Sequence, residues 1–436
     1  MEDVDAGFSF INGGQRVCFY RRQTVAGTYK FLSASADGAD EQVLANRKSP
    51  YPNIVACAPN GRLAILFEEP GQLETLDFNT GSKQTLLSLT GQAAYLSELC
   101  WDPSGKGLFA ILRQIGTPRT QLSFLSYPGA EMRQITNDPS DYRGMSLTAD
   151  GRTIVTRQTE WHDRFKVLSL AEPSRLEEHG PRGVWTFTWL DNGKILANDE
   201  QSALRLVNLF KNETTTLNVA KGHFFYAPSL CGPDKLISIG GTLVGNTVSV
   251  YKMNLDGSGA TQLTQGPLNK SPECTSDGRW LFYVDFFANR DPHRPFLMRL
   301  SLHGGTAQRV ASDTWLFDLS PDGKLLAMYS RDGSPHLQIL STDSLQIVQS
   351  FPLPLDFQNV DVIAFLADNK GVFYPTQTGA DTTIWRQPLE ASAPVKVASI
   401  PSGEGVYWIR PSPDGTKLGW VLYTQQSREV LLRDAR

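Results

Sequence analysis

The sequence predicts an all-β protein, a β-propeller built from four-stranded antiparallel blades. Three observations indicate this fold. A turn of the Pro-Asp-Gly type joins two short apolar segments, it recurs along the whole 436-residue chain, and each interval holds four short segments with strand-like composition. The spacing of the turns is nearly constant, which is typical of a repeat architecture.

The turn is clearest in residues 317–330, with the sequence FDLSPDGKLLAMYS. Pro321 fixes the first corner, Gly323 can adopt the positive φ of a tight turn, and an apolar run of strand length follows. Related turns give ten copies in all, at residues 11–14, 58–61, 102–105, 148–151, 190–193, 231–235, 275–278, 320–323, 367–371 and 412–415. Since 401 residues separate Gly14 from Gly415 over nine intervals, the repeat is about 45 residues long.

No linker rich in proline, glycine and serine interrupts this spacing. We therefore expect residues 1–436 to form a single domain of ten blades in one ring, with two smaller propellers as the alternative. The last repeat holds a second strand (KLGWVLY) and a third (EVLLRDA) but no fourth. Because an open ring leaves raw sheet edges, we expect residues near Val4 to supply this outer strand, or the strand to be absent.

Composition and net charge limit the classes of partner that the chain can be expected to bind. Apolar residues make up 40% and charged residues 20% of the chain, and the net charge is −4, so nothing draws the whole chain toward nucleic acid or an anionic membrane. We find no run of about 20 apolar residues and no signal peptide, and expect a soluble chain whose start looks excised from a longer protein. The odd number of cysteines favours small buried side chains over disulfides for Cys18, Cys57, Cys100, Cys231 and Cys274.

The repeat also resembles a known family. The SPDG hairpin and the segment YKMNLDGSGATQLTQGPLNKSPECTSDGRWLFYV, residues 251–284, are similar to the TolB-type, WD40-like (PD40) propellers. That family includes TolB, tricorn-like and prolyl-peptidase propellers, and sensor-like C-terminal regions of bacterial membrane-bound kinases and winged-helix regulators. The resemblance implies a bacterial protein. If the chain is part of such a regulator, the resemblance implies a periplasmic or other extracytoplasmic location and a tether to a transmembrane segment. Otherwise it implies a cytoplasmic location.

Candidate binding residues lie on the face opposite the Pro-Asp-Gly turns, where the first strands begin and line the central channel. Aromatic side chains stand at the entrances of these strands, and arginine is frequent in the loops beside them. An aromatic and cationic rim suits a protein partner or a small acidic or sugar-like ligand. The alternative is that the aromatic side chains are core between blades and the arginines are solvated. The candidates are Arg21, Arg113, Tyr142, Arg157, His162, Trp185, Phe225, Arg290, His293, Trp315, Arg331 and Trp408.

Catalytic patterns are sparse. No G-x-S-x-G nucleophile motif occurs, and the six histidines form neither H-x-x-x-H nor H-E-x-x-H, so we predict no catalytic residue, no metal and no cofactor. The favoured interpretation is a non-catalytic binding or sensing module that is monomeric and contacts neither nucleic acid nor membrane. Two alternatives remain open: a polysaccharide lyase or hydrolase that uses the channel, and a structural adaptor of an envelope complex.

Overall fold

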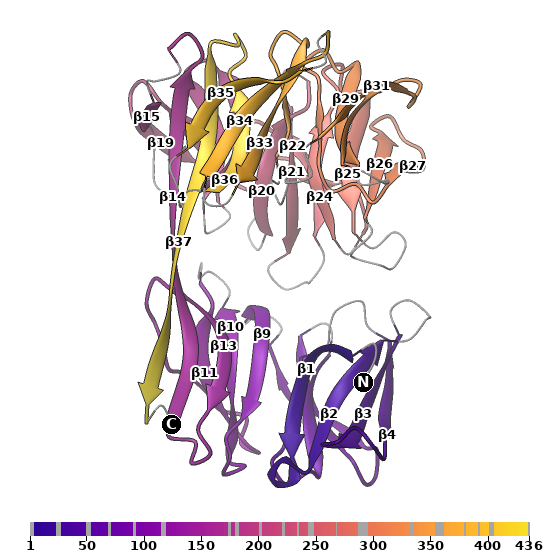
Figure 1. Cartoon of the computed structure of the whole chain (residues 1–436), viewed down its shortest axis with the longest axis vertical. Helices are drawn as coiled ribbons and strands as arrows, with labels where there is room; N and C mark the ends of the chain where they lie inside the picture. Colours follow the sequence, from indigo (N-terminus) through magenta and orange to yellow (C-terminus); the bar gives the residue numbers. More distant parts are fainter. Residues whose placement is uncertain are drawn as a thin grey trace. The chain divides into compact units, whose positions relative to one another are not determined.

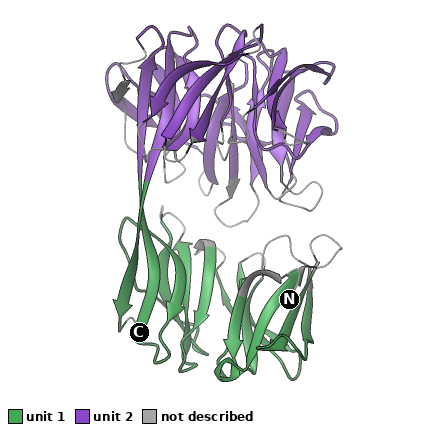
Figure 2. Cartoon of the chain, in the orientation of Figure 1, with its two compact units in different colours: residues 1–161, 243–246, 425–436 green, residues 162–242, 247–424 purple. Residues whose placement is uncertain are grey.

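The computed structural model describes all residues except 1–3, 23–27, 49–53, 69–70, 90–92, 115–118, 173–175, 179–182, 200–202, 220–222, 233–234, 243–247, 267, 287–294, 331–334, 354–361, 379–380, 391–392, 401–404 and 435–436. The described residues are all-β, apart from one short 3-10 turn, η1 (Asn12–Gly14), and form antiparallel sheets of mostly four strands. This confirms the predicted fold class. The chain divides into two compact units, which are described separately (Figures 1 and 2).

Unit 1 comprises residues 1–161, 243–246 and 425–436. Its first three sheets each hold four strands that follow one another in the chain. The inner strands β1, β5, β9 and β13 contact one another in that order, and we call this arrangement the four-sheet row. The strands that lie wholly in this unit are β1 (Val4–Ile11), β2 (Arg16–Arg22), β3 (Thr28–Ser35), β4 (Gln42–Lys48), β5 (Val55–Cys57), β6 (Leu63–Glu68), β7 (Gln72–Asp77), β8 (Lys83–Ser88), β9 (Ala93–Trp101), β10 (Gly107–Gln114), β11 (Gln121–Ser126), β12 (Met132–Gln134) and β13 (Asp141–Leu147).

Unit 2 comprises residues 162–242 and 247–424. Its inner strands β16, β20, β24, β28, β32 and β36 contact one another in that order, and β36 in turn contacts β16, so the sheets close into a six-sheet ring. The strands are β15 (Leu176–Glu178), β16 (Val184–Asp191), β17 (Lys194–Asp199), β18 (Leu204–Asn208), β19 (Glu213–Thr216), β20 (His223–Leu230), β21 (Lys235–Thr242), β22 (Ser249–Asn254), β23 (Thr261–Gln262), β24 (Asn269–Cys274), β25 (Trp280–Asp285), β26 (Phe296–Ser301), β27 (Gln308–Ser312), β28 (Phe317–Leu319), β29 (Leu325–Ser330), β30 (His336–Ser341), β31 (Ile347–Pro352), β32 (Ala364–Phe365), β33 (Gly371–Thr378), β34 (Asp381–Pro388), β35 (Val395–Ile400) and β36 (Gly405–Pro411).

Two long strands belong to both units. β14 (Thr153–Ser169) and β37 (Lys417–Arg433) are 17 residues each and pair with each other. In unit 1 the first half of β14 pairs with β13, and in unit 2 its second half pairs with β15. The first half of β37 pairs with β36. The sixth sheet of the ring therefore runs β36–β37–β14–β15 and joins the end of the chain to its middle.

These strands correct two predictions. The described sheets form a closed ring of six and a row of four, so one ring of ten blades is wrong and the alternative of two smaller units is nearer the structure. Because β14 and β37 continue from one unit into the other as unbroken strands, no linker marks the boundary in the sequence. The predicted closure is also wrong: Val4 lies in β1, opposite Arg21 of β2, and β15 is the outer strand of the last sheet of the ring.

The turn chemistry is confirmed. In the copy that ends at Gly323, this residue has φ 73° and its N–H donates to the carbonyl of Ser320. The Ser320 hydroxyl lies 2.7 Å from Oδ1 of Asp322 and accepts the N–H of Leu325, so the side chains hold the turn closed. In the ADNKG copy, Asn369 takes the positive φ, at 62°.

Four of the five cysteines form disulfides, which contradicts the prediction that they are free. Cys18 of β2 is bonded to Cys57 of β5, and Cys231, directly after β20, is bonded to Cys274 of β24. Each disulfide joins neighbouring sheets, because face-to-face packing brings these positions of successive repeats together. Cys100 is free, and burial, with Glu98 and Asp102 nearby, raises the pKa of its thiol to about 11.

Candidate functional site

A buried ion cluster occupies the inner strands of the six-sheet ring. Nη2 of Arg410, on β36, lies 2.7 Å from Oε1 of Glu273 on β24 and 3.3 Å from Oδ1 of Asp318 on β28. β36 and β24 are three places apart in the ring of six, so the Arg410–Glu273 pair joins opposite inner strands. The side chains of Arg410 and Glu273 are each 16% exposed, and that of Asp318 is 8% exposed.

Hydrogen bonds from neighbouring strands hold the carboxylates in place. The Ser229 hydroxyl of β20 donates to Oε2 of Glu273 at 2.6 Å, and the backbone N–H of Phe365 on β32 donates to Oδ2 of Asp318 at 2.6 Å. Nη1 of Arg410 donates to the carbonyl of Ile363 at 3.3 Å. Five of the six inner strands thus contribute to one polar cluster.

One guanidinium, that of Arg410, is the counter-ion of two carboxylates, those of Glu273 and Asp318. Burial raises the pKa of Asp318 to about 7, with Glu273 adding to the effect and Arg410 opposing it. Burial also disfavours the charge on Arg410, but Asp318 and Glu273 together raise its pKa above the ordinary value. Arg410 therefore keeps its charge, and burial favours the protonated form of Asp318.

Tryptophan and threonine side chains form hydrogen bonds between two further pairs of neighbouring inner strands of the ring. Nε1 of Trp408, on β36, donates to the carbonyl of Phe187 on β16 at 2.9 Å, and Nε1 of Trp189 donates back to the carbonyl of Arg410 at 3.0 Å. The backbone N–H of Ala227 on β20 donates to the Thr186 hydroxyl at 3.0 Å. The guanidinium of Arg410 lies 4.8 Å from the centre of the Trp408 aromatic ring, so this tryptophan also contacts the ion cluster.

An aromatic and cationic surface lies where two inner strands of the ring begin. Trp315, two residues before β28, is 37% exposed and packs edge-on against Phe286, which follows β25, at 5.4 Å between centroids. Nζ of Lys270, on β24, lies 5.1 Å from the centre of the Phe286 aromatic ring. We call these three side chains the Trp315 platform. On β36, the 41% exposed Tyr407 packs in the same edge-on way against Tyr423 of β37.

The structure divides the predicted site between the two units. Arg21, Arg113, Tyr142 and Arg157 belong to unit 1, so they are not part of the six-sheet ring. Arg21 bonds Glu41, Arg113 is half-buried on β10, and Arg157 is exposed on β14. Tyr142 is buried and its hydroxyl donates to Asp138 at 2.6 Å. It is therefore a core residue, which was the alternative to a place on the binding rim.

The candidates of unit 2 lie in different settings. His162 is exposed on β14, and the half-buried Trp185 donates to Asp163 at 3.0 Å. Phe225 is fully buried against Tyr251, so it is core and not part of a rim. Trp408 is half-buried beside the ion cluster and Trp315 forms the platform. Arg290, His293 and Arg331 lie outside the described residues.

The ion cluster was not among the predicted sites, although the sequence carries a signal for it. Glu273, Asp318 and Arg410 each stand five residues before their turn glycine, at positions 278, 323 and 415. Charged residues at one inner-strand position of three repeats indicate a shared location at the centre of a ring.

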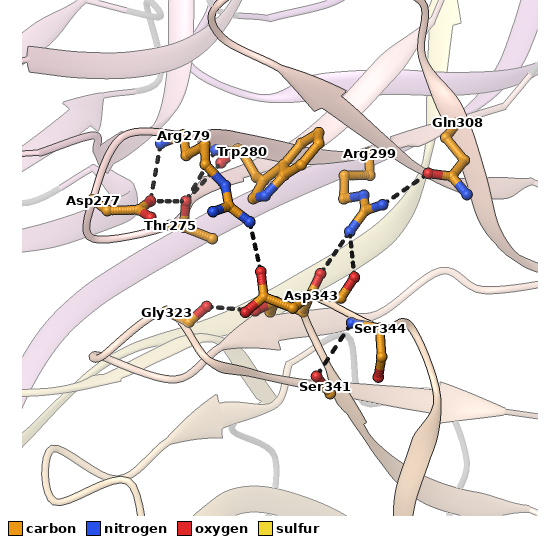
Figure 3. Close-up of polar contacts among 11 residues, drawn as sticks. Thr275, Asp277, Arg279, Trp280, Arg299, Gln308, Gly323, Ser341, Asp343 and Ser344 are labelled. Atoms are coloured by element: carbon orange, nitrogen blue, oxygen red, sulfur yellow. Dashed lines mark hydrogen bonds and ion pairs between the residues drawn. The ribbon is translucent and has the colours of Figure 1, made fainter.

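A second polar cluster joins two neighbouring sheets of the ring (Figure 3). Arg279 forms an ion pair with Asp343 at 2.6 Å, and Nη1 of Arg299 donates to the carbonyl of Thr342 at 2.7 Å. Both guanidinium groups lie over the aromatic ring of Trp280, at 5.3 and 4.2 Å. Burial and the nearby Arg279 lower the pKa of Arg299. These contacts fix the β30–β31 turn against the preceding sheet, so we regard the cluster as structural.

The described part of the chain shows neither a metal-binding cluster nor a membrane-spanning helix. Among its residues there is no group of three or more histidine, cysteine or carboxylate side chains that could hold a metal ion. None of its helices is long and apolar enough to cross a membrane.

Comparison with known proteins gives fold likeness alone. No family model and no curated protein matches the chain. Among solved structures, TolB from Acinetobacter baumannii is similar over 94% of this chain and 82% of its own, with 13% identity and a TM-score of 0.36. The tricorn protease is similar over 97% of this chain and 58% of its own, with 10% identity and a TM-score of 0.37. A chain of a nidogen/laminin complex is similar over 62% of this chain and 98% of its own, with 11% identity and a TM-score of 0.40. Likenesses this distant place the chain in no family.

Proposed function

We propose that the chain is a non-catalytic binding module, and that the six-sheet ring binds its ligand on the face where the inner strands begin. The observation that carries this proposal is the Trp315 platform. An exposed tryptophan with an aromatic neighbour and an ammonium group can stack on a sugar or an aromatic side chain while it attracts a carboxylate. We therefore propose an acidic sugar or an acidic peptide segment as the ligand.

The interior of the ring supports this role. Among the described residues, hydrogen bonds of side chains or the Cys231–Cys274 disulfide bridge five of the six pairs of neighbouring inner strands, and Arg410 joins opposite strands. Such cross-links make a rigid support, and a rigid support lowers the ordering cost of binding at loops and strand ends. The ion cluster is the support of the proposed site and not the site itself.

The test is a binding screen of the full chain against arrays of acidic oligosaccharides and acidic peptides, followed by calorimetry on the best binder. Trp315→Ala should weaken binding about tenfold or more, because it removes the central aromatic contact. Lys270→Gln should weaken binding of acidic ligands and leave neutral analogues unchanged.

The matched control is Phe210→Ala. Phe210 follows β18 in the same unit and is 77% exposed, but it lies beside the turn that contains Gly193, at the other end of the strands. Its replacement should leave affinity unchanged. A ligand whose affinity ignores Trp315→Ala, or turnover of an acidic polysaccharide by the purified chain, would overturn the proposal.

A further inference from the structure

The Trp315 platform combines side chains from two neighbouring sheets of the ring. Lys270 stands on β24, and Phe286 follows β25 in the same sheet. Trp315 belongs to the next sheet, where the backbone N–H of Tyr329 on β29 donates to the carbonyl of Leu316 at 3.1 Å. The distance between the ammonium group and the indole therefore depends on how β24 and β28 are held together.

Each of these two strands carries a carboxylate of the ion cluster three residues after its platform residue. Lys270 precedes Glu273 on β24, and Trp315 precedes Asp318, which lies on β28. Since an extended residue spans about 3.3 Å, at most about 10 Å of backbone separates a platform residue from its carboxylate. A shift of either carboxylate is therefore transmitted to the platform over a short stretch of strand.

The two strands of the platform are joined differently from the other inner strands. In the part of the chain that the structure describes, the other five neighbouring pairs are bridged by direct hydrogen bonds or by the Cys231–Cys274 disulfide. β24 and β28 are instead joined through Nη2 of Arg410, which lies 2.7 Å from Glu273 and 3.3 Å from Asp318. One guanidinium from β36 thus holds both strands that carry the platform.

Apolar packing also joins the two sheets, which limits the share of Arg410. Phe317 of β28 packs in one buried cluster with Phe282 and Val284 of β25. This contact does not depend on charge, so it keeps the sheets together when an ion pair is weakened. We therefore expect the loss of an ion pair to shift the platform residues and not to separate them.

We propose that Arg410 is a positioning residue for the Trp315 platform. By holding both carboxylates it fixes the distance between Lys270 and Trp315. An acidic ligand needs this distance to be set, because the ammonium group attracts its carboxylate while the indole stacks on the adjoining ring. The inference rests on the proposed binding function of the platform, and it makes the ion cluster a determinant of affinity as well as of stability.

The charges around Asp318 make this hold depend on pH. Glu273 of β24 and Arg410 of β36 act on its carboxylate, and β16 and β20 contribute an uncharged indole and hydroxyl to the cluster. β32 donates the N–H of Phe365, and β29 places Ala327 opposite Asp318. Burial raises the pKa of Asp318 to about 7. Protonation removes its attraction for Arg410, so affinity should fall from pH 8 to pH 6, where lysine and ligand carboxylates keep their charge.

Fluorine NMR of the full chain labelled with 5-fluorotryptophan tests the platform in the absence of any ligand. The resonance of Trp315, assigned by its loss in Trp315→Phe, should shift between pH 8 and pH 6. In Asp318→Asn it should keep one position at both pH values, because an amide has no charge to lose. Histidines that titrate in this range are unchanged in the variant, so they cannot produce the difference. Circular dichroism checks that each variant is folded.

Affinity is the second measurement. Calorimetry with the tightest binder from the acidic oligosaccharide and peptide arrays should show binding about fivefold weaker at pH 6 than at pH 8. Asp318→Asn should bind about fivefold more weakly at pH 8 and lose the pH dependence, and Glu273→Gln should weaken binding similarly. The matched control is Asp343→Asn, which breaks the exposed Arg279–Asp343 ion pair between the same two sheets. It should leave the resonance and the affinity unchanged.

The two measurements separate this inference from the proposed function. A Trp315 resonance that ignores both pH and Asp318→Asn, while the array binder still binds, would overturn the role of Arg410 and keep the binding function. A resonance that responds as expected in a chain that binds neither acidic sugars nor acidic peptides would support the role of Arg410 and overturn the binding function. An equal response to Asp343→Asn would show general loosening of the ring and contradict the inference.

Discussion

The six-sheet ring and the four-sheet row are built from the same repeat, yet their inner strands differ. Five residues before the turn glycine, the ring has Glu273, Asp318 and Arg410 in three of its repeats. The row has only uncharged residues at the equivalent positions, which are Ser9, Ala56, Cys100 and Ser146. Inner strands on opposite sides of a closed ring come within reach of each other's side chains, whereas the inner strands of the row contact one another in series, β1 with β5, β5 with β9 and β9 with β13. The comparison indicates that cross-ring charges accompany closure.

The largest expected effect comes from Arg410→Met. It leaves Glu273 and Asp318 buried without their cation, which should lower the free energy of unfolding of the ring by about 3–5 kcal/mol. Denaturant unfolding followed by tryptophan fluorescence measures it. Arg152→Met, which breaks the exposed Arg152–Asp434 pair of the row, should cost less than about 1 kcal/mol. Equal losses would remove the distinction between the two regions.

The two disulfides allow a matched comparison of the regions. They close loops of similar length, with sequence separations of 39 residues in the row and 43 in the ring. Loss of either bond, through Cys18→Ser with Cys57→Ser or Cys231→Ser with Cys274→Ser, should therefore cost about 2–4 kcal/mol by the chain-entropy account. Non-reducing peptide mapping should first show these two pairs and a free Cys100. A different pairing would contradict the contacts between neighbouring sheets.

Asp318 should make the stability of the ring depend on pH. Its pKa in the unfolded chain is near 3.8 and burial raises it to about 7 in the folded ring. Between these values the folded state holds a proton that the unfolded state has released, so this residue lowers stability as pH rises through that window. Asp318→Asn should flatten the dependence, because an amide keeps an acceptor for the N–H of Phe365. Unfolding curves from pH 4 to pH 7 for both chains measure the difference, and parallel profiles would contradict the assignment.

The smallest effect compares two turn glycines. Gly105 in the row and Gly323 in the ring both have φ 73°, but an added Cβ meets nothing within 4 Å at Gly105 and lies 3.0 Å from the backbone nitrogen of Ser276 at Gly323. Gly105→Ala should cost about 1 kcal/mol for the backbone strain alone. Gly323→Ala should cost about 1 kcal/mol more, because the neighbouring turn must shift. Thermal unfolding resolves the two, and equal costs would show that turns in the ring are not closely packed.

The local structure could be predicted from the sequence, whereas the closure of six sheets into a ring could not. The SPDG turns and the four strands of each repeat were predictable, because turn chemistry and strand alternation act over a few residues. The division of the chain into two units at β14 and β37 could not be predicted, because in the sequence each of these long strands looks like two ordinary strands joined by a loop. Whether Gln158 and Trp161 lie in a loop or in the middle of a strand depends on pairing with residues near Ser427, more than 260 positions away.

The candidate site shows the same limit. Trp315 was predictable as an exposed aromatic residue at a strand entrance. Trp408, which was expected on the same rim, is half-buried beside the ion cluster. Tyr142 and Phe225 carry the same sequence signal and are core, because alternation along a strand decides between rim and interior and a bulge can reverse it. Both β13 and β20 contain such register shifts.

A double-mutant cycle of Arg410→Met and Glu273→Gln tests the central claim most directly. These residues are 137 positions apart in the chain and meet only if the six sheets of unit 2 close a ring. We predict a coupling free energy of about 2 kcal/mol or more in denaturant unfolding at constant pH. Additive effects, with a coupling within about 0.5 kcal/mol of zero, would contradict the closed ring and the ion pair at its centre.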